Sequence, residues 1–312
     1  MFYSERNTIF HGTSLINEPA VNSIREYFLL GLLALLWGSS YLFIRVGVET
    51  IPPATLVTLR VTIAAAVLLM VIKAQGHSLP KDLHTWKNLV IQAFFNSFGA
   101  WILLAWGQQY VESGLAGVLN STSPIFVFFI TWIITRHERV SARKVLGAFV
   151  GLGGVILIIG VDALQNLGQQ VIAQLAILLS AMFYGYAAIF GKRFSHLPPT
   201  VTAAGVMLSA SAVLIPASLI IDKPWTLSPS LLSLSAVGAL GVFGTALALL
   251  LYFRLIQTLG SLGTASQAYL RMGVSVLLGI VFLGEEFSLV IGVGLLTAFL
   301  GVALINMPGK TK

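Results

Sequence analysis

One stretch of the sequence occurs twice: an apolar segment, a short charged turn and a glycine-rich apolar segment. The first copy spans 115–160, and shifted by 147 positions it falls on 262–307 without a gap. Ten of the 46 aligned positions are identical, among them the turn glutamates Glu138 and Glu285 and two glycines in each copy. This repeat constrains the fold more than any local pattern does, because both copies must adopt the same supersecondary structure.

The repeat lies in a chain whose composition suits a bilayer. Of its 312 residues, 57% are hydrophobic and 9% are charged, whereas roughly a quarter are charged in soluble domains. A helix needs about 20 apolar residues to cross the hydrocarbon core. We therefore predict an all-α membrane protein with ten transmembrane helices, after a polar tail of residues 1–26 that does not resemble a cleavable signal peptide. The predicted spans are 28–48, 54–73, 88–110, 115–135, 143–161, 171–191, 200–221, 231–253, 262–283 and 288–307.

The positive charges orient these spans. Lysine and arginine stay on the cytoplasmic side because their translocation is disfavoured. With both termini and the even-numbered connections in the cytoplasm, that side holds 14 of the 18 cations. The sequence thus predicts a multi-pass protein of the bacterial inner (cytoplasmic) membrane with both termini cytoplasmic. Topology explains the basic composition, so we expect the lipid bilayer as a partner and no nucleic acid.

The repeat also divides the chain into two units. Residues 27–161 and 171–307 each hold five spans, and the IPPAT motif at 51 in the first unit is matched by LPPTV at 197. Because five is odd, the second unit enters the membrane in the opposite direction. Two inverted five-helix repeats are typical of transporters with a binding site near the midplane and two states, each open to one side.

The inventory of titratable groups argues against an enzyme. All eleven acids and all five histidines fall in tails, loops or span ends, whereas an intramembrane hydrolase needs a buried base. The chain has no cysteine, which excludes disulfides and thiolate metal sites, and no cofactor or metal is expected. The same distribution argues against a buried carboxylate proton relay.

Two arginines lie within spans. Arg271 is about nine residues into its span and hence roughly 13 Å deep, close to the midplane. A cation there must face protein or a wet cavity, where it could pair with a substrate carboxylate; alternatively it bonds backbone carbonyls. We expect Arg271→Ala to abolish uptake of carboxylate-bearing solutes. Arg60 lies nearer a span end and could bind substrate or simply extend to the interface.

Polar and aromatic side chains near the midplane complete a candidate cavity. Such a lining suits an amphipathic zwitterion. The alternative roles are hydrogen bonding between helices for the polar residues and packing for the aromatic ones. The candidates beside the arginines are Trp37, Ser40, Asn96, Trp101, Asn120, Tyr184, Gln267 and Tyr269.

Two further features concern helix shape and packing. Pro124 in the fourth span is expected to kink it, which could serve gating or only shape the bundle. Small residues form stripes on the fifth and tenth spans that permit close helix packing, either within a copy or at a homodimer contact. They are Gly147, Gly151, Gly154, Gly294 and Ala298.

Several short motifs resemble the EamA family of the drug/metabolite transporter superfamily. They are WGSSYLFIR (37–45), TLRVTIAAA (58–66), SPIF (123–126), HERVS (137–141) and GEEFS (284–288). The resemblance covers nearly all of residues 28–307. It implies ten helices, cytoplasmic termini and export or exchange of small metabolites, often amino acids, as in the aromatic amino acid exporters. The chain departs from the family pattern at His137, where a glycine is usual, and at Arg271, where a proline is usual.

These observations predict an exporter, uniporter or exchanger of small organic metabolites, most of all amino acids, that works by alternating access. One alternative is an exchanger of anionic or phosphorylated metabolites that uses Arg60 and Arg271 together. A multidrug exporter and a membrane scaffold without turnover are the others.

Overall fold

The computed structural model of the chain describes residues 23–135, 142–159, 168–252, 254, 255, 258, 267–286 and 289–306. All regular elements in these ranges are helices. From here on, the two five-helix units are called the two copies. The first copy contains α1 (Ser23–Gly47), α2 (Pro53–Ala74), α3 (Leu83–Ala93), η1 (Phe94–Phe98), α4 (Gly99–Gly107), α5 (Ser113–Asn120), α6 (Ser123–Thr135) and α7 (Ala142–Ile159). The second contains α8 (Gln169–Phe190), η3 (Gly191–Phe194), α9 (Pro199–Ile221), η4 (Pro224–Thr226), α10 (Leu231–Gly241), η5 (Val242–Leu247), α12 (Gln267–Leu283) and α13 (Leu289–Asn306).

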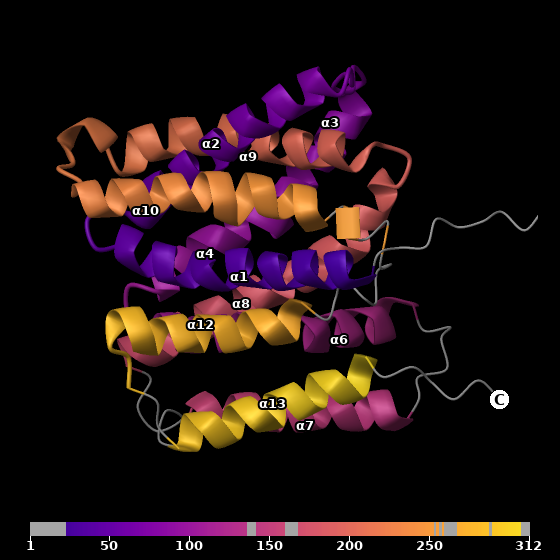
Figure 1. The fold of residues 1–312 in the computed structure, drawn as a ribbon, viewed down its shortest axis with the longest axis vertical. Coiled ribbons are helices and arrows are strands. Elements are labelled where there is room, and N and C mark those ends of the chain that lie inside the picture. The colour runs from indigo at the N-terminus through magenta and orange to yellow at the C-terminus, as the bar shows by residue number, and fades with distance from the viewer. Residues whose placement is uncertain are drawn as a thin grey trace, which may run out of the picture.

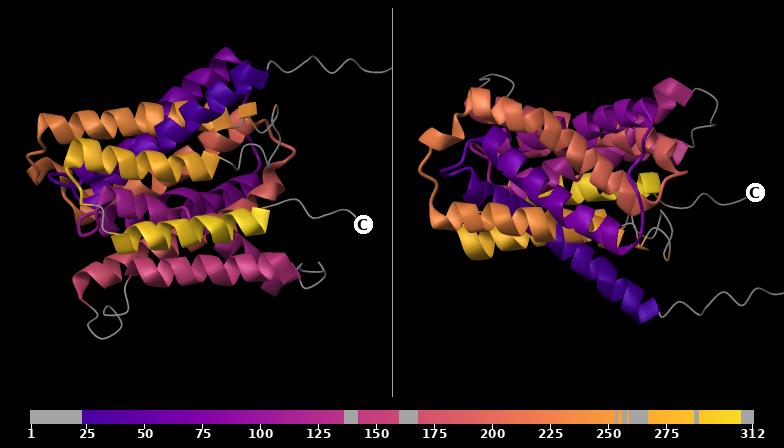
Figure 2. Two further views of the ribbon diagram at one scale, coloured as in Figure 1. Left: turned by 60° about the horizontal axis from the view of Figure 1, so that its bottom comes forward. Right: turned by 90° about the horizontal axis from the view of Figure 1, so that it is seen from above.

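The helices lie side by side in a bundle whose long elements share one general direction (Figure 1). The pair α7 and α13 forms one edge, and α2, α9 and α3 form the opposite edge. Between them, α1 packs on α12 and α10, and α4 packs on α8. The views in Figure 2 show the same layers from two other directions. Each of these contacts joins the two copies, so the copies fold as one body.

Seven helices of the described residues are long and apolar enough to cross a bilayer, judged by length and composition. The predicted spans 143–161, 262–283 and 288–307 contain only the shorter apolar helices Val145–Leu157, Leu270–Leu283 and Gly292–Gly301. Each of these three spans adjoins or includes residues outside the described part of the chain. The architecture is thus all-helical with seven candidate spans, and the count of ten remains a prediction.

The third span of each copy begins with a side-chain cap and contains a π-helical turn at the same place. Asp82 accepts a hydrogen bond from the backbone N–H of Thr85 and caps α3, while Ser230 caps α10 through the backbone N–H of Ser233. Side-chain caps of this kind satisfy N–H groups that a helix start leaves free. A π-helical turn begins 12 residues after each cap, since 94 − 82 and 242 − 230 are both 12. The match reveals the repeat in a region where the sequences have diverged.

The second spans, α2 and α9, pack against each other in opposite directions. Thr55 at the start of α2 donates its N–H and its hydroxyl to Asp222 after the end of α9, each at 2.7 Å. At the other end, the Thr200 hydroxyl of α9 donates to Gln75 after the end of α2, at 2.9 Å. Gln75 and Asp222 are 147 positions apart, the spacing of the repeat. The start of each of these helices thus contacts the residue that follows the end of the other, and the two acceptors occupy matching positions in the copies.

The glycine stripes face each other at the edge of the bundle. A Cβ on Gly301 of α13 would overlap the backbone of Gly151 of α7, and a Cβ on Gly154 would overlap the backbone at Ala298. Small residues of the fifth and tenth spans thus let the two backbones touch. The prediction of a contact within one copy was wrong for this face, because the two copies pack on each other through it. A homodimer stays a prediction.

We expect Gly301→Ala to lower the melting temperature of the purified protein, because the added methyl group has no space between α13 and α7. Overpacking of this kind costs about 1–3 kcal/mol. The matched control is Gly153→Ala in α7, where a Cβ would meet no atom within 4 Å and where alanine favours the helix by up to about 1 kcal/mol. Equal melting temperatures for the two variants would contradict the packing of α7 on α13.

Candidate substrate-binding site

Arg60 lies in the middle of the bundle. Its side chain is 4% exposed, and its guanidinium carbon is 3.6 Å from the centroid of the Trp101 ring. Stacking on an indole face partly replaces the solvation that a buried cation loses. Arg60 therefore does not extend to the interface, which was the alternative for this residue.

The π-turn of η5 provides the hydrogen-bond partner of Arg60. The Arg60 Nε donates to the hydroxyl of Thr245 at 2.8 Å, and this hydroxyl donates to the carbonyl of Leu240, five residues back, at 2.9 Å. π-turns widen a helix locally and are frequent at functional sites. Here the turn directs a hydroxyl oxygen at the guanidinium, which fixes one side of it and leaves its terminal nitrogens without a protein acceptor among the described residues.

Tyr184 of the second copy positions the Trp101 ring, and these two side chains form the aromatic wall of the site. The indole N–H of Trp101 donates to the hydroxyl of Tyr184, which lies on α8. Because α4 and α8 belong to different copies, the position of the indole over Arg60 depends on how the copies are placed relative to each other.

A hydrogen-bonded chain crosses the bundle beside this wall. The Tyr41 hydroxyl donates to Asn120 Oδ1 at 3.0 Å, and Asn120 Nδ2 donates to the Ser180 hydroxyl at 3.3 Å. Asn120 is the last residue of α5, where the fourth span breaks before α6. Pro124 in the first turn of α6 has no N–H to offer to the Asn120 carbonyl, which explains the break. Whether the break serves gating remains a prediction.

The second arginine approaches this break from α12. Arg271 Nη2 lies 3.5 Å from the hydroxyl of Ser121, which itself donates to the Gly117 carbonyl at 2.7 Å. The Arg271 Nε is buried and has no hydrogen-bond partner among the described residues. Arg271 is thus held more weakly by the protein than Arg60 is.

Among the residues that the structure describes, the site carries positive charge without a counter-ion. Arg271 reaches the hydroxyl of Ser121, next to Asn120, which accepts a hydrogen bond from Tyr41. Arg60 stacks on Trp101, which donates to Tyr184, so both arginines border the same group of polar and aromatic side chains. Neither arginine forms an ion pair with a described residue, and the ion pair of Arg254 with Glu26 lies elsewhere in the bundle. An arrangement of two arginines, aromatic rings and amide and hydroxyl groups can bind an anionic group and an apolar body next to it.

The structure brings some predicted residues together and separates others. Ser40 is close, because its hydroxyl would lie 2.7 Å from a Cβ at Gly244 in the same π-turn. Trp37 is directed elsewhere and packs on Tyr252 with ring centroids 5.2 Å apart. The Asn96 amide donates to the hydroxyl of its neighbour Ser97, at 3.5 Å, and forms no other hydrogen bond with a described side chain.

Two predicted residues on α12 add little to this geometry. Gln267 begins the helix and is buried, with its Oε1 unpaired among the described residues. The side chain of Tyr269 lies outside the described part of the structure.

Sequence reasoning missed Thr245 and Ser180, the hydroxyl partners of Arg60 and Asn120. The repeat offers a signal for Thr245. The caps Asp82 and Ser230 are 148 positions apart, and the residue 148 positions before Thr245 is Ser97. A buried hydroxyl therefore lies at the same distance from the cap in both copies.

Comparison with known proteins decides the family. The model of the EamA-like transporter family matches twice, over residues 24–160 and 171–307. The chain belongs to the EamA-like transporter family. The two matches make this member a protein of two EamA units, with Arg60 and Trp101 in the first and Tyr184, Thr245 and Arg271 in the second.

Several relatives of this EamA protein are named as transporters. The "Uncharacterized inner membrane transporter YedA" of Escherichia coli (strain K12) is 31% identical over 278 residues, covering 88% of each chain. The "Uncharacterized transporter YoaV" of Bacillus subtilis (strain 168) is 30% identical over 172 residues, 54% of this chain and 59% of the relative. A solved structure titled "Crystal structure of protein" has the same fold, with a TM-score of 0.65 at 21% identity, over 90% of this chain and 97% of its own.

Proposed function

We propose that this EamA protein is an inner-membrane transporter of small organic metabolites that carry a carboxylate, amino acids foremost, and that it works by alternating access. Membership of a transporter family and the relative named as an inner membrane transporter support transport over catalysis. The observation that carries the substrate proposal is Arg60, a buried cation that stacks on Trp101 and has no carboxylate of a described residue beside it.

The substrate supplies the missing anion in this proposal. A carboxylate can accept two hydrogen bonds from one guanidinium in a bidentate pair, which is among the strong polar interactions in proteins. The terminal nitrogens of Arg60 are the donors, and Trp101 and Tyr184 form the wall for the apolar part of the solute. Arg271 adds to the positive potential and is free to engage the same solute, because Ser121 holds it only at 3.5 Å.

Alternating access follows from an inverted arrangement of the copies. The opposite directions of α2 and α9, which occupy the same place in their copies, support this arrangement. Two halves related in this way have two states of similar free energy, one open to each side. In the proposed orientation both termini are cytoplasmic, as the distribution of cations indicates.

A second candidate is an exchanger of anionic or phosphorylated metabolites. It is favoured by two arginines that border the same group of polar and aromatic side chains, since a doubly charged anion would use both. The site offers no carboxylate, within the described residues, to hold the ammonium of an amino acid. A multidrug exporter of cations is disfavoured for the same electrostatic reason.

Counterflow in proteoliposomes tests these alternatives. Purified protein is reconstituted with a panel of amino acids, dicarboxylates, sugar phosphates and cationic dyes, and labelled solute uptake is compared with protein-free liposomes. We expect uptake of carboxylate-bearing solutes, led by amino acids. Uptake of sugar phosphates alone would establish the second candidate, whereas traces equal to those of protein-free liposomes for every solute would leave only the scaffold.

A further inference from the structure

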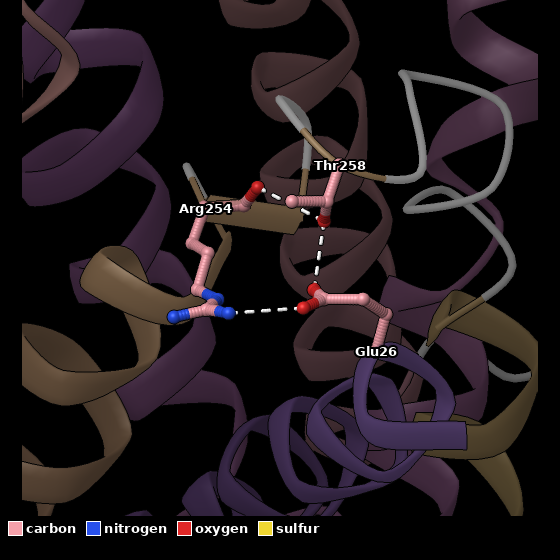
Figure 3. A network of polar contacts seen from close by, with 3 residues as sticks. All are labelled: Glu26, Arg254 and Thr258. Carbon is pink, nitrogen blue, oxygen red and sulfur yellow. Dashed lines mark hydrogen bonds and ion pairs between the residues drawn. The ribbon is translucent and has the colours of Figure 1, made fainter. Parts of the chain in front are cut away.

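Two glutamates form hydrogen bonds that connect the two copies, because each glutamate lies in one copy and its partners lie in the other. The first is Glu26 in the first turn of α1. Its carboxylate accepts hydrogen bonds from Arg254 Nη2 at 2.9 Å and from the Thr258 hydroxyl at 2.8 Å (Figure 3). Glu26 is 4% exposed. This ion pair ties the beginning of the first copy to the segment that follows the third span of the second copy.

The second is Glu285, the turn glutamate of the sequence repeat. Its two carboxylate oxygens accept the backbone N–H groups of Ser113, at 2.5 Å, and of Gly114, at 2.8 Å. These are the first N–H groups of α5, which have no partner inside the helix. Here a side chain of the second copy caps a helix of the first.

Glycines make the space that the Glu285 carboxylate occupies. A Cβ on Gly279 of α12 would overlap this carboxylate, and a Cβ on Gly114 of α5 would lie 3.1 Å from Oε2. The carboxylate is thus wedged between α12 and α5 and not only placed at their ends. Any separation of these two helices must first remove it from the gap.

The two contacts lie at opposite ends of the bundle. Arg45 is 19 residues after Glu26 on α1, which corresponds to about 28 Å at 1.5 Å per residue. Arg45 donates to the carbonyl of Gln108 after α4, five residues before Ser113. The distance between the contacts is therefore close to the thickness of a bilayer core, roughly 30 Å. In Figure 1 the start of α1 and the turn from α12 to α13 lie at opposite sides.

We propose that Glu26 and Glu285 are two latches, each of which keeps one end of the substrate pathway closed by tying the two copies together there. Opening at one end requires that its own latch is released while the other latch holds. This inference rests on the proposed alternating access of the two copies. It assigns to the repeated turn glutamate a role in the conformational cycle, which the substrate site by itself does not explain.

The chemistry of both contacts suits a reversible latch. Charge-assisted hydrogen bonds are stronger than neutral ones, so each contact biases the closed end. Both glutamates stand at span ends, where water can replace the partners when the end opens.

Glu112 and Glu286 line the same small pocket as Glu285, and burial beside Glu285 raises the pKa of Glu112. The adjacent Glu286 is exposed and provides a control for its charge.

Cysteine labelling tests the latches without a substrate. The chain contains no cysteine, so a single Leu30→Cys reports on the Glu26 end and a single Leu115→Cys on the Glu285 end. Leu30 is 5% exposed and Leu115 is 9% exposed. Each reporter is placed in the starting protein and in Glu26→Gln, Glu285→Gln, and the controls Glu49→Gln and Glu286→Gln, all in lipid nanodiscs that leave both ends accessible. The rate of reaction with a membrane-impermeant maleimide is measured.

We expect Glu285→Gln to speed labelling at Leu115→Cys at least threefold and to slow labelling at Leu30→Cys. Glu26→Gln should have the reverse effect, and the controls should change neither rate. Gly279→Ala, which displaces the carboxylate but keeps its charge, should act like Glu285→Gln, and Arg254→Gln should act like Glu26→Gln. Gly279→Ala and Arg254→Gln thus test the same two latches if Glu285→Gln or Glu26→Gln does not fold.

Two results would overturn the latches. One is unchanged labelling in all four latch variants, and the other is faster labelling at both ends together, which indicates a merely structural role. Because labelling needs no solute, a reciprocal change in a protein that transports nothing would refute the proposed function and leave the latches standing.

Discussion

Replacing Arg60 with glutamine is expected to lower the affinity for a carboxylate-bearing substrate by at least roughly 30-fold. Removing one partner of a buried, hydrogen-bonded charge pair costs about 2–5 kcal/mol, and each 1.4 kcal/mol is about tenfold in affinity. Glutamine retains a polar group near Thr245 but loses the charge and the flat cation that stacks on Trp101. The dissociation constant is measured by substrate-dependent thermal shift and by calorimetry on the purified protein.

Two comparison variants separate charge from structure at this position. Lys73→Gln removes a cation from the exposed end of the same helix and should leave the affinity within twofold of the starting protein. Arg60→Lys keeps the charge but loses the fork geometry and the stacking, so we expect an intermediate loss. If the Arg60→Gln and Lys73→Gln variants bind the substrate with equal affinity, Arg60 is not part of the binding site.

Replacing Arg271 with alanine is expected to abolish uptake of carboxylate-bearing solutes while leaving the folded yield largely intact. The yield should survive because the protein holds this side chain only through Ser121 and leaves its Nε unpaired among the described residues. Loss of uptake is expected because the substrate anion loses one of the two cations in its neighbourhood. Uptake in proteoliposomes and the size-exclusion profile of the variant are measured together.

A neutral solute gives the control for Arg271→Ala. If the panel contains a transported solute without a carboxylate, its uptake should change little in this variant. Wild-type uptake of carboxylates by Arg271→Ala would show that Arg271 has no part in binding and that Arg60 acts alone.

The sequence predicted the features that repeat. The shift of 147 positions indicated the two copies, and the all-helical class followed from the apolar composition. The prolines of the matching IPPAT and LPPTV motifs start α2 and α9, where a missing N–H costs nothing. Local chemistry of this kind depends only on neighbouring residues, which is why it could be read without a structure.

The geometry of the site could not be read in the same way. Arg60 was placed near a span end, and only the packing of α2 on α4 shows that it lies flat on Trp101. Its partner Thr245 depends on a π-turn that no residue type requires. Trp37 was assigned to the cavity from its depth alone, but the face of α1 that carries it packs on Tyr252. Depth along a helix follows from sequence, whereas the direction of a side chain depends on tertiary contacts.

The role of Glu285 shows the same limit. The repeat identified the residue but not its target, because the target is a pair of backbone N–H groups more than 170 positions away in sequence. Glu138, its counterpart in the first copy, lies outside the described residues.

The inverted arrangement of the two copies is tested most directly by the sidedness of two matching connections. His77 follows α2 and Ser228 follows α9, and both are exposed. Each is replaced singly by cysteine in this cysteine-free chain, and intact cells are treated with a membrane-impermeant maleimide before and after permeabilisation. The account predicts labelling of Ser228→Cys in intact cells and of His77→Cys only after permeabilisation. Labelling of both from the same side of the membrane would contradict it.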